Sequence, residues 1–180
     1  MNQIKDLAIK KVKVSTLVQF VALIGIASAA PLLHQQIITG SIVNATLFIS
    51  TMLLGVQGGI LIGLTPSLIA LSTGLLSPVL APMIPFIMMG NVILVISFNY
   101  LKGKNYWMGI ISASILKFLF LFSSSSMVMN LILKKELALK VSTMMSWPQL
   151  LTALLGGLIA YLFLKSFSKK IPIGISSPRS

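Results

Sequence analysis

Apolar residues gather into six long runs, separated by short stretches of Gly, Pro, Ser and charged residues. A helix needs about 20 apolar residues to cross the roughly 30 Å hydrocarbon core of a bilayer. We therefore expect an all-α membrane protein, a bundle of six transmembrane helices with short loops. The expected spans are Val14–Leu33, Ser41–Leu54, Ile60–Leu76, Pro82–Leu101, Tyr106–Leu133 and Thr143–Leu164.

The second and third runs are the least certain of the six. The glycine-rich segment Gly55–Gly59 separates them, and the second run is short. Two short spans fit this pattern, and so does one re-entrant hairpin buried among the other helices.

Composition agrees with a membrane location and excludes several function classes. Of the 180 residues, 56% are hydrophobic and only 9% are charged, whereas a soluble domain carries about 25% charged residues. The chain has no cysteine, one histidine and two acidic residues, so we expect no metal site, no redox chemistry and no cofactor. The lysines cluster at the ends of apolar runs, which favours contact with lipid headgroups over nucleic-acid binding.

The lysines also predict the orientation in the membrane. Ten of the 14 basic residues fall in the N-terminus, the C-terminus and the loop with Lys102 and Lys104, which places both termini in the cytoplasm. The expected organisation is a basic N-terminus (1–13), a transmembrane domain (14–165) and a disordered cytoplasmic tail (166–180). Three lysines of the fifth loop, external in this topology, violate the rule. Alternatively, the first run is a secretory signal cleaved after Ala27-Ser28-Ala29, which would leave five spans.

Lys117 is the most informative polar residue because it falls near the middle of the fifth span. No acidic residue lies in any span to neutralise it, and Ser114, Leu121 and Ser124 share its helix face. It either lines a cavity and meets an anionic or carbonyl-bearing ligand, or it snorkels and donates to neighbouring helices.

Two asparagines in other spans fit the same cavity. Asn44 follows Ser41 on a polar stripe of the second span, and Asn91 follows the Pro78–Gly90 segment, whose three prolines break or kink the start of the fourth span. Both asparagines could instead simply join helices. Met83, Met88 and Met89 could form an adaptable apolar lining, although methionines in a span more often serve plain packing.

Further candidates lie at the predicted outer ends of the spans. Trp147 and Gln149 open the sixth span, where a planar ligand could stack, although Trp at a headgroup boundary is usually an anchor. His34 lies in the first external loop. Together, the candidate substrate-binding residues are His34, Asn44, Asn91, Lys117, Trp147 and Gln149.

Small residues mark two faces for close helix packing. Gly59 and Gly63 form a GxxxG pattern, and Ala22, Gly25 and Ala29 share a face of the first span. Packing within the chain is the default for both faces. Docking of a partner membrane protein is the alternative for the first helix.

The chain lacks the groups that most catalytic or energised functions require. It contains no Walker loop, no HExxH or GxSxG motif, and no intramembrane carboxylate for ion coupling. We therefore expect no enzymatic activity. The remaining function is to bind or conduct a solute with energy supplied by another subunit.

Several segments resemble the substrate-binding S components of energy-coupling-factor (ECF) transporters. The similar segments are Thr39–Asn44, Leu54–Gly59, Gly63–Pro66, Ala81–Phe86 and Gly90–Asn91, and the resemblance extends over residues 14–165. It implies a six-helix plasma-membrane protein that captures a vitamin or similar micronutrient from outside. It also implies partners: an ECF transmembrane coupling subunit, docked on the first helix, and two ATPase subunits. The family's docking motif is an alanine-xxx-alanine, and Ala22, Gly25 and Ala29 are its nearest match here.

A second function class stays open. A non-transport membrane scaffold or assembly subunit would also display small-residue faces and lack catalytic groups.

Overall fold

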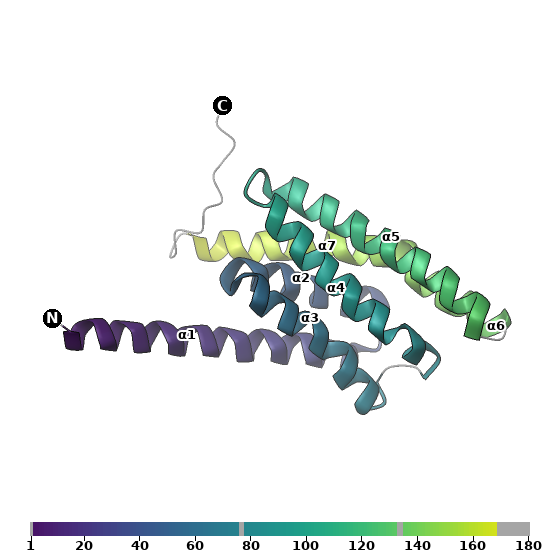
Figure 1. Cartoon of the computed structure of the whole chain (residues 1–180), viewed down its shortest axis with the longest axis horizontal. Helices are drawn as coiled ribbons and strands as arrows, with labels where there is room; N and C mark the ends of the chain where they lie inside the picture. The colour runs from purple at the N-terminus through teal and green to yellow at the C-terminus, as the bar shows by residue number, and fades with distance from the viewer. Residues whose placement is uncertain (1, 76–77, 133–134, 169–180) are drawn as a thin grey trace.

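The computed structural model describes residues 2–75, 78–132 and 135–168, and this part of the chain is built from helices (Figure 1). Their bounds are α1 (Asn2–Ala29), η1 (Ala30–Leu33), α2 (Gln36–Leu53), α3 (Gly55–Ser72), η2 (Pro78–Met83), α4 (Ile84–Leu101), α5 (Tyr106–Ile132), α6 (Lys135–Met145) and α7 (Trp147–Ser168). α7 continues past the expected start of the tail at residue 166, and residues 169–180 lie outside the described residues.

Six stretches of the described helices are long and apolar enough to cross a membrane. The prediction of an all-α bundle of six transmembrane helices is therefore confirmed, and the protein is a multi-pass membrane protein. α2 and α3 are separate helices of 18 residues each, about 27 Å long at 1.5 Å per residue. This length favours two spans over one re-entrant hairpin.

The glycine-rich segment between these two helices differs from the expectation. α2 begins at Gln36 rather than Ser41, and α3 already begins at Gly55, which turns the chain with a φ of 77°. Gly59 and Gly63 allow close packing between helices and do not break α3. A Cβ on Gly59 would lie 2.7 Å from the Thr51 hydroxyl, and one on Gly63 would lie 3.1 Å from the Asn91 Cβ. The default of packing within the chain therefore holds for Gly59 and Gly63.

The segment after α5 also differs from the expected external loop. It forms the helix α6, and a break at Ser146 separates α6 from α7. The last apolar stretch begins at Val141, close to the expected Thr143, and so includes the end of α6. α6 is amphipathic: Val141 and Met145, one turn apart, are buried, whereas Leu139 is exposed. The apolar side of α6 thus covers one end of the bundle.

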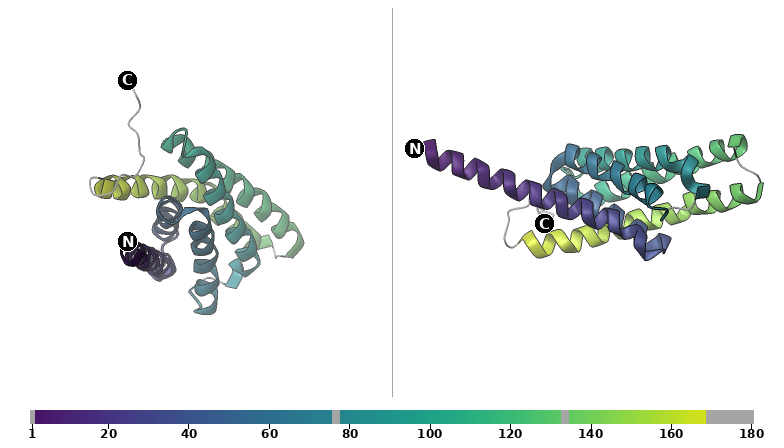
Figure 2. Two further views of the ribbon diagram at one scale, coloured as in Figure 1. Left: turned by 60° about the vertical axis from the view of Figure 1, so that its left-hand side comes forward. Right: turned by 90° about the horizontal axis from the view of Figure 1, so that it is seen from below.

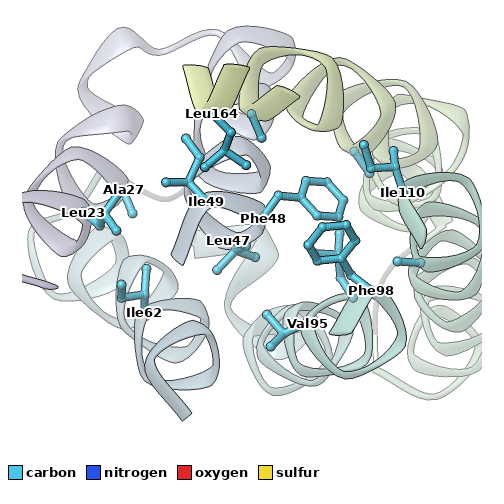
Figure 3. Close-up of a cluster of buried hydrophobic side chains, with 14 residues drawn as sticks. Leu23, Ala27, Leu47, Phe48, Ile49, Ile62, Val95, Phe98, Ile110 and Leu164 are labelled. Atoms are coloured by element: carbon cyan, nitrogen blue, oxygen red, sulfur yellow. The ribbon is translucent and has the colours of Figure 1, made fainter. Parts of the chain in front are cut away.

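α2 is the central helix of the bundle. Its residues from Asn44 to Thr51 are all buried, and it contacts α1, α3, α4 and α7. Phe48 packs edge-to-face on Phe98 of α4, with ring centroids 4.8 Å apart (Figure 3). Leu23 and Ala27 of α1 join the same hydrophobic core.

The helix faces turned away from this core are strongly apolar. Large exposed hydrophobic side chains occur on all six spans, as lipid contact requires. α1 packs along one side of the bundle, and its N-terminal half extends beyond the other helices (Figure 2).

Candidate functional site

A cavity of about 350 Å³ opens at the end of the bundle where α1 joins α2, α3 joins α4, and α6 joins α7. The start of α1 and the end of α7 lie toward the opposite end (Figure 1). Side chains from every span after α1 reach the cavity. The lining residues are Pro31, His34, Gln35, Gln36, Thr39, Gly40, Val43, Asn44, Pro66, Ser67, Ala70, Leu75, Leu80, Ile87, Asn91, Lys117, Met144, Met145, Gln149 and Thr152.

Lys117 and two asparagines form the floor of this cavity. The Lys117 ammonium donates to Oδ1 of Asn44 at 2.6 Å and to Oδ1 of Asn91 at 2.8 Å. Asn44 lies about 12 Å along α2 from its start at Gln36, and Asn91 about 10 Å along α4. All three side chains are buried, Lys117 with only 3% of its surface exposed. The floor therefore lies deep in the hydrocarbon region.

The two asparagines are themselves held in place by further hydrogen bonds. Nδ2 of Asn44 donates to the Thr152 hydroxyl at 3.3 Å, and Nδ2 of Asn91 donates to the carbonyl oxygen of Gly63 at 2.8 Å. Because each amide nitrogen donates away from the lysine, each amide oxygen faces Lys117. The network joins α2, α3, α4, α5 and α7 through polar groups that lipid could not satisfy.

The rim of the cavity is held by neutral polar side chains. Nε2 of Gln36 donates to the carbonyl oxygen of Met144 at 2.7 Å, and Nε2 of Gln149 donates to the same oxygen at 3.2 Å. These bonds fasten the end of α6 to the starts of α2 and α7. His34, with a left-handed φ of 51°, ends η1 at the rim.

The structure brings five of the six predicted site residues together around this cavity: His34, Asn44, Asn91, Lys117 and Gln149. Trp147 does not join them. Its side chain is 59% exposed and lies outside the lining, so its place fits the anchor interpretation. The expected methionine lining is also misplaced. Met83 packs in a hydrophobic cluster with Leu80, and the methionines at the cavity are Met144 and Met145.

Sequence reasoning missed several polar lining residues, notably Gln36, Thr39 and Thr152. Gln36, Thr39, Gly40, Val43 and Asn44 follow helical spacing and line one face of α2. This stripe was hidden because the helix was expected to begin at Ser41. Thr152 lies one turn after Gln149 and shares its face, a spacing that the sequence does contain.

The small-residue face of α1 does not pack against the part of the chain that the structure describes. Ala22, Gly25 and Ala29 are all exposed, and a Cβ added to Gly25 would meet nothing within 4 Å. α1 contacts the bundle through Leu23 and Ala27, which lie on another side of the helix. The default expectation of internal packing was therefore wrong for this face.

The fold and the cavity together define the class: a multi-pass α-helical membrane protein with a polar-floored cavity at one end of the bundle. Comparison with known proteins finds no matching family model, no matching curated protein and no matching solved structure. Function must therefore be inferred from the chain's own residues.

Proposed function

We propose that this protein is the membrane-embedded substrate-binding S subunit of an ECF-type importer. In this role it captures a vitamin or similar micronutrient at the plasma membrane for uptake driven by partner ATPases. The observation that carries the proposal is the cavity with Lys117, Asn44 and Asn91 on its floor. It has a volume typical of small-molecule sites and combines apolar walls with a few convergent polar groups.

The charge distribution supports capture from outside. Lys102, Lys104 and Lys165 lie at the end of the bundle opposite the cavity. Since positive residues favour the cytoplasmic side, the cavity opens outward.

The packing below the floor supports a need for partner subunits. One turn further along α2, Phe48 packs on Phe98, and Tyr106 packs on Phe98 in turn, with ring centroids 5.6 Å apart. A solute held at Lys117 meets this dense core on its way to the cytoplasmic end. Release inward therefore requires the helices to move, and the chain has no ATP-binding motif to power such a movement.

The exposed face of Ala22, Gly25 and Ala29 supports docking on a transmembrane coupling subunit. Small side chains let two helix backbones approach closely in the membrane, and this face is not occupied by the chain's own helices. The family assignment itself rests on the sequence resemblance.

Mass spectrometry of small molecules that co-purify with the chain tests the proposal. We expect one solute at a stoichiometry near one, and uptake of that solute by cells that also express an ECF coupling subunit and its ATPases. A chain that carries no solute and supports no uptake with these subunits would contradict the proposal.

The second candidate is a non-transport scaffold, favoured by the same exposed face of α1. A scaffold would form a stable complex with its partner without any solute. It would also tolerate Gln149→Leu, which alters the cavity rim and leaves α1 unchanged.

A further inference from the structure

Among the described residues, the lining of the cavity contains one lysine and no acidic side chain to balance its charge. Lys117 is the charged residue of the lining, and both of its partners are neutral amide oxygens. The chain's two acidic residues, Asp6 and Glu136, both lie outside the candidate spans. A buried charge is costly unless an opposite charge or strong hydrogen bonds compensate it.

The hydrogen-bond geometry leaves Lys117 with a donor to spare. An ammonium group has three N–H donors, and two of them go to Asn44 and Asn91. Because Lys117 lines the cavity, the third donor is available to a solute there. Nδ2 of Asn44 and Nδ2 of Asn91 each use one of their two N–H donors on Thr152 and Gly63, so Lys117 is the group of the floor that offers a charge-assisted donor.

The walls above the floor are aliphatic. Among the described lining residues none is Phe, Tyr or Trp, and the apolar contacts come from Val43, Ala70, Leu75, Leu80, Ile87, Met144 and Met145. Such walls offer dispersion contacts to a saturated body, and the imidazole of His34 at the rim is the one aromatic ring of the described lining. A volume of about 350 Å³ equals that of roughly a dozen waters at ~30 Å³ each.

We propose that the solute is a compact monoanion with an aliphatic body, which places its carboxylate or other singly charged anionic group on Nζ of Lys117. This inference rests on the proposed binding function and names the chemistry of its substrate. The anion would supply the missing counter-charge at the floor, and the aliphatic body would fill the space below the rim.

Matched probes on the full chain in lipid nanodiscs test this inference by isothermal titration calorimetry. Cyclohexylbutanoate and cyclohexylbutanamide share one body and differ in charge, and naphthylacetate offers a planar aromatic body with the same anionic group. We expect the cyclohexyl carboxylate to bind about tenfold or more tightly than its amide, the range of a charge-assisted hydrogen bond, and more tightly than naphthylacetate.

Two variants locate the binding on the lysine. Lys117→Met should remove the preference for the carboxylate over the amide. Lys165→Met, which deletes an exposed charge at the opposite end of the bundle, should leave the preference unchanged and so control for partition into lipid. The comparison of probes on the wild-type chain does not require either variant to fold.

Three results would overturn the inference. They are equal or tighter binding of the amide, a carboxylate preference that survives Lys117→Met, and binding of neither cyclohexyl probe.

The identity of a co-purified solute separates this inference from the proposed function. A neutral or aromatic solute would refute the aliphatic monoanion while leaving a solute-binding subunit intact. Failure to support uptake with ECF subunits would refute the S-subunit role while leaving the carboxylate preference to be judged on its own.

Discussion

Nζ of Lys117 on α5 lies 2.6 Å from Oδ1 of Asn44 on α2, although the two residues are 73 positions apart in the chain. This contact joins two helices deep in the hydrocarbon region, where lipid offers no alternative hydrogen-bond partner. Lys117 is the only lysine among the described lining residues, and this contact fixes the direction of its amino group. The following predictions test the packing, the cavity and the exposed face that surround this pair.

Asn91→Leu should destabilise the protein. The substitution removes an acceptor from the Lys117 ammonium and leaves the Gly63 carbonyl without its amide donor. Loss of such buried bonds costs about 1–3 kcal/mol. Thermal unfolding in detergent should show a lower Tm for this variant than for Asn99→Leu, a half-buried asparagine two turns further along α4. Equal Tm values for the two variants would show that the network does not stabilise the bundle.

Trp147→Ala should leave solute binding nearly unchanged, whereas Gln149→Leu should weaken it. The Trp147 side chain is exposed outside the cavity, whereas Gln149 lines the cavity and donates to the Met144 carbonyl. We expect Trp147→Ala to leave the affinity for the co-purified solute within about twofold, and Gln149→Leu to weaken it by about tenfold, the effect of one hydrogen bond. A strong loss in Trp147→Ala would restore the stacking interpretation.

Gly156→Ala should disrupt the bundle, whereas Gly25→Ala should not. A Cβ on Gly156 would lie 2.7 Å from the backbone nitrogen of Ala45 and 2.9 Å from the carbonyl oxygen of Ser41, so α2 and α7 would have to separate. At Gly25 the added methyl meets nothing within 4 Å, and Ala favours a helix by about 1 kcal/mol over Gly. The yield of monodisperse protein in size-exclusion chromatography, together with Tm, measures the difference. A Gly156→Ala variant as stable as wild type would mean that the α2–α7 contact yields easily.

Ala22→Trp should abolish association with an ECF coupling subunit without changing solute affinity. The bulky side chain would hold a partner helix away from the exposed small-residue face, while the cavity lies on other helices. Co-purification with the tagged coupling subunit measures association, and calorimetry with the solute measures affinity. Leu17→Trp, at an exposed position on a different side of α1, is the matched control and should still associate. Association of Ala22→Trp at the wild-type level would exclude this face as the docking site.

Lys102 should make stability depend on pH. Burial lowers the pKa of Lys102 below its ordinary value of 10.5, while its ammonium still donates to the carbonyl oxygen of Thr51. A folded pKa below the unfolded one means that the charged lysine opposes folding. As the pH rises from the lowered pKa toward 10.5, Lys102 loses its proton in the folded protein, and the stability of the fold increases. Lys102→Met should therefore flatten the rise of Tm with pH in this alkaline window, whereas Lys104→Met, at an exposed site, should not. An unchanged slope in Lys102→Met would contradict the prediction.

Much of the cavity floor could be predicted from the sequence because a bilayer tolerates few polar groups. Lys117, Asn44 and Asn91 stand out in apolar runs, and each therefore required a polar partner. The rim was harder to predict. Gln36 and Thr39 lie near a helix start, where polar residues are ordinary, and Trp147 sits at a boundary where an anchor and a ligand contact share the same sequence pattern.

The sequence by itself determined the class of fold. Runs of about 20 apolar residues must be helical to satisfy their backbone groups in lipid, so the all-α class followed from hydrophobic length. The number of spans did not, because the short second run also fitted a re-entrant hairpin. Their order and short connections followed from the breaks between them.

Only the tertiary structure decided which polar groups meet. Helical periodicity fixes the face on which Lys117 lies but not its partners, because contacts between helices depend on how each helix rotates and approaches its neighbours. The same limit applied to the small-residue faces of Gly59 and Gly25, which look alike in sequence. Close packing against Thr51 and Val95 buries the first, while the second faces away from the bundle.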